Sequence, residues 1–560
     1  MVNIESHKSS SQLRIGLIVD SNWSSKYVYD LCEWAKQQKV LAISHIFIQE
    51  LPKGGHSKPR KALDSFRKNG FLEMLADISF SILTKFELLL LVRSKVHADH
   101  LGKFNLNDFG IKSTLLQTTQ SKSGMVHRFS DQEIHKISKT EIDVLVRCGT
   151  GILRGKILSA TRFGIISFHH GDNRVNRGGP SGFWEVFLRQ ESTGFTLQQL
   201  TEELDGGRVL ARGNYPTRKY YLLNQASLAL KSNHYMKKTL EHLANYRKLP
   251  DEEKPIPFFN PLYRRPDLRV QGIYSLRLFV ILARDLLKKL HPAKQEPWRV
   301  AYIKGNWRSI VMRKGIKLLN PTNHFLADPF VITVNNSTFC FVEDFDFEIK
   351  RGSISVYALG EHSAQRIGKA ISEPFHMSFP FVFRDESKIY MLPETAENRD
   401  IRLYECINFP LEWRLKKILM SNINAADSII FKNSGLWWLF TNIDVSDLGD
   451  HSSELHIFYS ENLITDSWNP HRSNPIFIDS SKARNAGFLV DDSNVFRVSQ
   501  RHGLGAYGKS ASLNRVIKLN PDEYLEEFTM ELEPNFFPNL RGTHHLHSNG
   551  QFTVFDFLEK

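Results

Sequence analysis

The last third of the chain repeats one pattern, two short apolar strands joined by a polar turn. Copies begin at Phe325, Phe379 and Ala425, and weaker copies begin at Ala486 and His544. They recur at roughly 50–60 residues, a spacing that favours the blades of a β-propeller over a solenoid. We therefore expect an all-β, five-bladed propeller over residues 297–560. A strand near 298–303 or 309–313 would close the ring.

Acidic residues follow the strands of these repeats. Carboxylates on the inner strands of different blades converge on a propeller's axis, and glycosidases use two or three of them. The alternative is that acids at blade turns only satisfy backbone N–H groups. We favour a carbohydrate-binding site over hydrolysis, with these candidate residues: Asp328, Glu343, Glu394, Asp427 and His544.

The first part of the chain alternates strands with helices. Strands are expected at 13–20, 40–47, 86–92 and 142–147, and an amphipathic helix at 26–38. This alternation predicts an α/β domain with a doubly wound parallel sheet over residues 1–245. The loop after the first strand lacks G-x-G-x-x-G, which disfavours a dinucleotide cofactor.

The stretch 164–210 carries the strongest local signal in this domain. A short apolar strand at 164–168 ends in His169 and enters a polar, Gly-rich loop. Polar groups at the carboxyl end of such a strand lie where open α/β sheets bind ligands. A second strand candidate follows at 194–200, and Asp205 then stands between a leucine and two glycines. An acid in that setting predicts a tight loop.

This stretch resembles the catalytic half of the formyltransferases that use 10-formyltetrahydrofolate. Their Asn-x-His strand end corresponds to Ser167 and His169 here, and their Leu-Asp-x-Gly loop corresponds to Asp205. The resemblance implies that His169 donates to the developing oxyanion and that Asp205 holds the histidine or moves a proton. Ser167 stands where the family has Asn, and its shorter hydroxyl would have to supply the second donor, through water if needed.

The loop after His169 has two interpretations. Its polar residues could bind an anionic acceptor, or they could form a solvated loop. The residues concerned are Asn173, Arg174, Arg177, Gly178 and Gly179.

The repeat region resembles the five-bladed propeller at the N-terminal end of glucosamine inositolphosphorylceramide transferases. The matching segments are 327–329, 373–383, 391–395, 437–438 and 543–545. The resemblance implies the fold; it does not by itself imply a function.

Between the two regions, residues 246–296 are Pro-rich and charged, as linkers are, and end in an amphipathic helix at 275–290. We prefer a packing helix between domains. The alternative is a helix that lies on a membrane surface, giving a weak membrane contact.

Composition narrows the class of protein. The 560 residues carry a net charge of +13 with Lys and Arg spread along the chain, which fits anionic small molecules better than nucleic acid. The four cysteines have no metal-ligand spacing, so we expect free thiols in a reducing compartment and no metal site. The polar N-terminus and the lack of a run of ~18 apolar residues predict a cytoplasmic protein with no transmembrane segment.

Together these patterns predict an enzyme that transfers a formyl group from 10-formyltetrahydrofolate to an amine of a sugar nucleotide or glycan precursor. The propeller would bind the carbohydrate. Two alternatives stay open. One is a carbohydrate-binding protein with a degenerate formyltransferase fold. The other is a glycosidase or glycosyltransferase site in the propeller.

Overall fold

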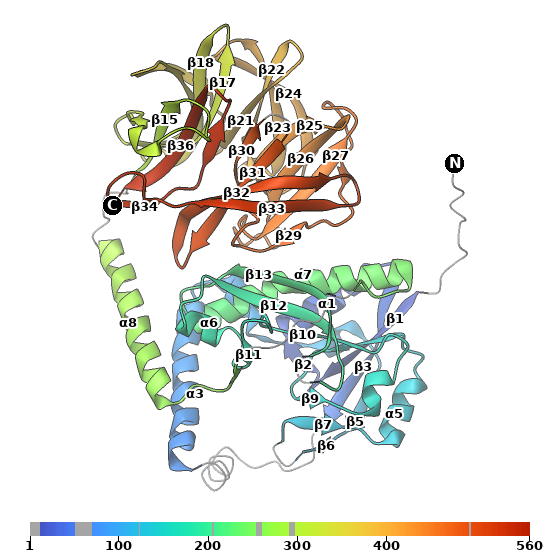
Figure 1. Ribbon diagram of the computed structural model, residues 1–560. Helices are drawn as coiled ribbons and strands as arrows, with labels where there is room; N and C mark the ends of the chain where they lie inside the picture. The colour runs from blue at the N-terminus through green and yellow to red at the C-terminus, as the bar shows by residue number, and fades with distance from the viewer. Residues whose placement is uncertain are drawn as a thin grey trace, which may run out of the picture. The chain divides into compact units, whose positions relative to one another are not determined.

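The computed structural model describes residues 12–50, 70–121, 124–203, 206–251, 253, 260–290, 297–491 and 494–559 (Figure 1). The chain divides into two compact units. The N-terminal unit comprises Met1–Gly213 and Thr217–Leu286, and the C-terminal unit comprises Asn214–Pro216 and Leu287–Lys560. The expected loop at 52–60 and the candidate Asp205 lie outside the described residues.

A seven-stranded sheet forms the centre of the N-terminal unit, in the order β13-β12-β10-β8-β1-β3-β5. Strands β5, β3, β1, β8 and β10 run parallel, and β12 is antiparallel to β10. The strands are β1 (Leu13–Val19), β3 (Leu41–Glu50), β5 (Ser113–Gln117), β8 (Val144–Arg147), β10 (Ile165–His169), β12 (Ser192–Gln199) and β13 (Arg208–Pro216).

Helices cover both faces of this sheet. Helices α1 (Lys26–Lys36) and α7 (Tyr221–Tyr246) share one apolar cluster with alternate residues of β1 and β3. Helix α5 (Asp131–Ser138) and the turn η2 (Lys156–Ser159) share another cluster with the opposite set of side chains. This arrangement agrees with the predicted doubly wound α/β sheet.

The strand expected at 86–92 is wrong, because these residues belong to a helix. Helix α3 spans Phe71–Leu91 and buries a stripe that includes Ala76, Phe80, Leu83 and Leu91. The run 86–92 is rich in leucine, a strong helix former, and a short apolar run cannot separate strand from helix by periodicity alone.

The predicted amphipathic helix is longer than expected and begins earlier. Helix α8 spans Leu268–Leu290, and its buried Tyr274 and Leu278 pack with α3, α6 (Phe183–Phe187) and α7. The smaller elements of this unit are β2 (Trp23–Ser25), α4 (Lys95–His100), β4 (Lys103–Asn105), η1 (Leu106–Phe109), β6 (Thr119–Gln120), β7 (Val126–Arg128), β9 (Ile152–Leu153), β11 (Arg177–Gly178) and β14 (Leu262–Tyr263).

Each of the five repeats in the C-terminal unit forms one antiparallel hairpin. The Asn335–Asn336 and Ser434–Gly435 turns adopt positive φ, as tight hairpin turns require. The hairpins are β17 (His324–Val334) with β18 (Ser337–Asp346), β21 (Ser378–Asp385) with β22 (Lys388–Glu394), β25 (Ala425–Asn433) with β26 (Leu436–Ile443), β30 (Asn485–Asp491) with β31 (Asn494–Gly503), and β35 (Leu546–Ser548) with β36 (Phe552–Glu559).

Further strands extend these hairpins into four sheets. The extending strands are β19 (Arg351–Leu359), β20 (Ala364–Ile371), β23 (Asp400–Asn408), β24 (Glu412–Ser421), β27 (Glu454–Ser460), β28 (Asn469–Pro470), β29 (Phe477–Ile478), β32 (Ala506–Leu519), β33 (Tyr524–Leu532), β34 (Leu540–Gly542), β15 (Trp298–Lys304) and β16 (Ile316–Lys317); the turns η3 (Met312–Lys314) and η4 (Ala396–Asn398) complete the unit.

The first strands of the hairpins contact one another in chain order. Strand β17 contacts β21, β21 contacts β25, β25 contacts β30, and β35 contacts both β30 and β17. The early strand β15 pairs with the last strand, β36, along all seven of its residues. A strand at 298–303 therefore joins the start of this region to its end, as the sequence predicts.

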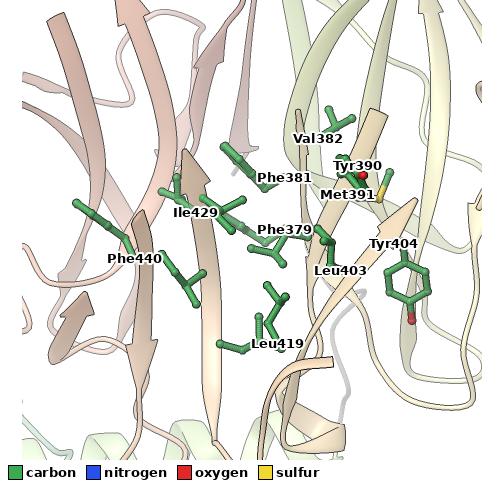
Figure 2. Close-up of a cluster of buried hydrophobic side chains, with 14 of the residues drawn as sticks. Phe379, Phe381, Val382, Tyr390, Met391, Leu403, Tyr404, Leu419, Ile429 and Phe440 are labelled. Atoms are coloured by element: carbon green, nitrogen blue, oxygen red, sulfur yellow. The ribbon is translucent and has the colours of Figure 1, made fainter. Parts of the chain in front are cut away.

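The largest apolar cluster of the C-terminal unit lies between neighbouring hairpins (Figure 2). Phe379 and Leu403 from one sheet stand beside Ile429 and Phe440 from the next. Aromatic side chains bury large apolar areas, so this layer holds successive sheets together.

Candidate functional site

The first strands of three hairpins share a bend at the same position. In each, two residues bulge out of the ladder, after Ala327, Ser378 and Ala426. The first bulged residue has left-handed φ in all three: +50° at Asp328, +46° at Phe379 and +49° at Asp427. A non-glycine residue in this region is held against its preference, and such residues cluster at functional sites.

Carboxyl groups stand opposite two of these bends. Glu343 pairs in the ladder with Ala327, and Glu394 pairs with Ser378. With Asp328 they line a pocket of about 270 Å³. The remaining lining residues are Trp298, Phe325, Ala327, Phe345, His376, Ser378, Arg484, Tyr507 and His544.

The guanidinium of Arg484 lines the same pocket. Its Nε lies 2.6 Å from Oδ2 of Asp427, and its charge sits 5.2 Å from the centre of the Tyr507 ring. Trp298 stands over His544 with ring centres 4.2 Å apart. The pocket thus combines carboxyl groups, one guanidinium and flat aromatic surfaces, a set suited to polar ligands with apolar faces.

Three of the carboxyl groups hold their protons more strongly than exposed acids do. Burial raises the pKa of Glu343 well above its ordinary value, and the charges of Asp328 and Glu394 add to the rise. Burial also raises the pKa of Glu394, against hydrogen bonds from Asp427 and Ser378. Burial raises the pKa of Asp427 to about 7, although Arg484 opposes the shift. A carboxyl group whose pKa is raised by burial is suited to donate a proton.

Asp328 behaves in the opposite way. Burial alone would raise its pKa, but a hydrogen bond from His545 and the charges of both neighbouring histidines lower it. His544 Nδ1 lies 2.7 Å from Asp556, and this carboxylate raises the pKa of His544 despite burial. The pKa of Asp328 is therefore lowered while the pKa values of the neighbouring acids are raised, which separates a base from an acid.

One group of side chains in the described part of the chain could hold a metal ion. Ligand atoms of Asp328, His544 and Asp556 lie within 4.8 Å of one another. Carboxylate and imidazole ligands suit a divalent cation. The same three residues also pair with one another, since His544 Nε2 lies 3.4 Å from Asp328 and the amide of Asp328 donates to Asp556.

The pocket brings together most of the residues predicted in this region. Asp328, Glu343, Glu394 and His544 line it. Asp427 is not among the lining residues, but it pairs with Arg484, which is. Five further residues of this region were not predicted from the sequence: Arg484, Trp298, Tyr507, His376 and Asp556. Arg484 precedes the fourth repeat by two residues, and Asp556 lies on the last predicted strand. Their positions relative to the repeats are the sequence feature that could have identified them as site residues.

In the N-terminal unit, His169 is the last residue of β10 and pairs with Thr196 of β12. Its ring is half-buried, and Nε2 lies 3.4 Å from the carbonyl oxygen of Asn176. Ser167 is buried, two residues earlier on the same strand, and its hydroxyl donates to the carbonyl of Phe168 at 3.3 Å. The two predicted donors therefore lie on one strand, as expected.

The loop after His169 is organised by a buried acid. Asp172 accepts from Arg174 and from Arg212, with Arg212 Nη1 at 2.5 Å from Oδ1. Burial alone would raise the pKa of Asp172, but hydrogen bonds from Arg174 and the charge of Arg212 lower it. Asn173 accepts from the same Arg212 nitrogen at 2.6 Å. Asn173 and Arg174 thus contribute to an internal network of the loop.

The other residues predicted in this loop, Arg177, Gly178 and Gly179, lie beside β14. Arg177 pairs with Leu262, and Gly178 pairs with Tyr263. Gly178 has φ +85°, and a Cβ on it would stand 2.1 Å from the Tyr263 carbonyl oxygen. The amide of Gly179 donates to that oxygen at 3.2 Å. Only glycine fits at position 178, because the backbone of Tyr263 approaches too closely to leave room for a Cβ atom.

Comparison with known proteins places one similarity on the C-terminal unit. Residues 310–542 match the family model described as glucosamine inositolphosphorylceramide transferase 1, N-terminal. The transferase of that name from Oryza sativa subsp. japonica is 35% identical over 211 residues, which cover 37% of this chain and 28% of the rice protein. The Arabidopsis thaliana protein is 35% identical over 212 residues, 37% of this chain and 27% of its own. The chain thus spans little more than a quarter of these relatives.

Solved structures give more distant likenesses. The catalytic domain of a GH62 α-L-arabinofuranosidase from Coprinopsis cinerea aligns with TM-score 0.33 and 13% identity, covering 46% of this chain and 86% of that domain. A phosphoribosylglycinamide formyltransferase from Anaplasma phagocytophilum aligns with TM-score 0.28 and 15% identity, covering 42% and 88%. Likenesses at these scores assign neither fold nor activity.

Among the helices of the described residues, none is long and apolar enough to cross a membrane.

Proposed function

We propose that the C-terminal unit binds a carbohydrate in the acidic pocket and serves a sugar-modifying transferase. We infer further that its five hairpins are the blades of a propeller with the pocket at its axis. The observation that carries the proposal is the pocket itself, in which three carboxyl groups converge beside Arg484 and the aromatic rings of Trp298 and Tyr507. The pKa values of Asp328 and Glu394 shift in opposite directions, which separates a base from an acid within it.

The chemistry follows from that separation. In glycosyl transfer, a protonated carboxyl gives its proton to the leaving oxygen as the glycosidic C–O bond breaks. An ionised carboxylate takes the proton of the acceptor hydroxyl as the new C–O bond forms. Glu394 and Asp328 are the acid and the base in this proposal. Trp298 and Tyr507 supply flat surfaces for the apolar face of a sugar ring.

The relatives named as glucosamine inositolphosphorylceramide transferases support an amino-sugar-containing ligand. A binding screen with glucosamine, N-acetylglucosamine and their glycosides, followed by calorimetry, tests this. Wild-type protein should bind at least one of them, and Trp298→Ala should weaken that binding by about 1–2 kcal/mol, as loss of an aromatic contact does. Glu461→Gln, at an exposed position of the same unit, is the matched control. Absence of binding to every sugar would overturn the proposal.

A second activity is proposed for the N-terminal unit, transfer of a formyl group from 10-formyltetrahydrofolate to an amine. It rests on His169 and Ser167 at the carboxyl end of β10, where α/β sheets bind ligands. Release of tetrahydrofolate is the measurement, with His169→Ala expected to abolish it. Ser167→Asn should retain it or raise it by up to ~10²–10³-fold, the contribution of one oxyanion donor. If neither wild type nor Ser167→Asn binds formyl-folate, this activity is ruled out.

A further inference from the structure

Two neighbouring helices of the described chain expose apolar stripes opposite the faces that they bury. On α3 the exposed set includes Ile78, Ile82, Phe86 and Leu89, with Leu89 71% exposed. These residues recur every three or four positions, so they share one face of the helix. A stripe of this kind on a folded chain marks an interaction surface rather than a core.

Helix α8 repeats the arrangement. Leu276 is 65% exposed, Phe279 is 69% exposed, and Val280 stands beside them on the helix surface. The opposite face carries Tyr274 and Leu278, which are buried. Figure 1 shows α8 beginning next to α3, and both helices belong to the N-terminal unit up to Leu286.

Buried hydrogen bonds fix which faces point outward. Gln271 of α8 donates to the carbonyl oxygen of Ala76 on α3 at 2.9 Å. The hydroxyl of Tyr274 donates to Glu87 of α3, and Glu87 also accepts from the amide of Leu222 at 2.7 Å. Turning either helix to bury its apolar stripe would leave these polar groups buried without partners, which is costly.

The charged residues of α8 have one dominant sign. Helix α8 carries five cations and one acid, Asp285, which pairs with Lys219 at 2.8 Å. The cations are Arg269, Arg277, Arg284, Lys288 and Lys289. An apolar helix face bordered by Arg and Lys is the pattern of helices that lie in the interface of an anionic membrane.

We propose that α3 and α8 dock the protein on an anionic lipid bilayer, with Leu276 and Phe279 entering the headgroup boundary. Arg269 and Arg284 then contact lipid phosphates. The proposal uses none of the residues that line the pocket of the C-terminal unit and does not use His169, so it does not depend on either proposed activity.

Vesicle flotation with the full chain tests the proposal. Wild-type protein should float with vesicles of phosphatidylcholine mixed with phosphatidylserine, and less with phosphatidylcholine alone. The variant Leu276→Gln/Phe279→Gln/Val280→Gln should lose binding to both by about 10-fold or more, since each apolar side chain removed weakens insertion. The variant Arg269→Glu/Arg284→Glu should lose the preference for phosphatidylserine, because each cation near the surface contributes about a factor of five.

The matched control is Leu525→Gln/Phe528→Gln, which changes two exposed apolar residues of β33 in the C-terminal unit. It should float as wild type does. Equal flotation of wild type and the triple α8 variant would overturn the proposal. So would a sedimentation result in which wild type forms a dimer that the triple variant abolishes, with no flotation, because a second copy would then cover the face.

Discussion

The two units gather acidic side chains at their candidate sites in opposite ways. In the N-terminal unit, Asp172 is buried with two arginines, and its charge is fully compensated. In the C-terminal pocket, several carboxyl groups surround Arg484, and the pKa values of Glu343, Glu394 and Asp427 rise as a result of burial and mutual repulsion. An acid paired with two arginines holds a loop in place, whereas several acids that share one arginine beside a pocket can move protons.

The largest expected difference between the two sites is in the turnover of a sugar substrate. Asp328→Asn removes the ionised carboxylate of the pocket and should lower turnover of a sugar substrate by ~10²–10⁴-fold, as loss of a general base does. His169→Ala, in the other unit, should leave that turnover unchanged. Steady-state kinetics with both variants is the measurement. An active Asp328→Asn protein would show that the pocket only binds.

Next in size is the cost of removing the cation that compensates Asp172. Arg212→Ala should lower the free energy of unfolding by about 3 kcal/mol, because one partner of a buried ion pair then remains alone. Chemical denaturation followed by circular dichroism measures it. If Arg212→Ala lowers the free energy of unfolding by less than a substitution at an exposed position does, Arg212 does not hold Asp172 in place.

A smaller effect is expected in the pH dependence of folding stability. The folded-state pKa of Asp427, about 7, lies above the ordinary value of 3.8, so the folded protein binds this proton more tightly than the unfolded chain does. The stability that this group contributes is complete below pH 3.8 and is lost as the pH rises through 7. Relative to wild type, Asp427→Asn should therefore become more stable between pH 4 and pH 7, by at most ~1.4 kcal/mol per pH unit. A difference in unfolding free energy between the two proteins that does not change with pH would contradict the raised pKa of Asp427.

The smallest effect is expected at the exposed side of the Asp172 network. Arg174→Ala should cost less than about 1 kcal/mol, because its side chain is partly exposed and Arg212 still compensates the acid. Thermal unfolding at two salt concentrations measures it. A larger loss, matched by loss of an anionic ligand, would instead support the acceptor-binding interpretation of this loop.

The sequence predicted the elements that depend on local pattern. Five repeats became five hairpins. Asp328 lies at the bend of β17, Glu343 and Glu394 pair with residues beside such bends, and these three line one pocket with His544. A leucine-rich run at 86–92 was misassigned, since its helix is defined by packing against α7 and α8.

Charge pairing could not be predicted, because it depends on residues far apart in the chain. Arg212 reaches Asp172 across 40 positions, and Arg484 reaches Asp427 across 57. A lone arginine in a polar stretch gives no local signal of either role. The partners are fixed only when the sheets assemble.

The left-handed bends of the C-terminal unit have a consequence for comparing related chains. Asp328 and Asp427 hold a conformation that glycine adopts more easily, at a cost of about 1–3 kcal/mol each. A descendant that no longer used the pocket would gain stability by drifting to glycine or asparagine at these two positions. The residue types at these two positions in a newly sequenced relative therefore indicate whether its pocket is still under selection.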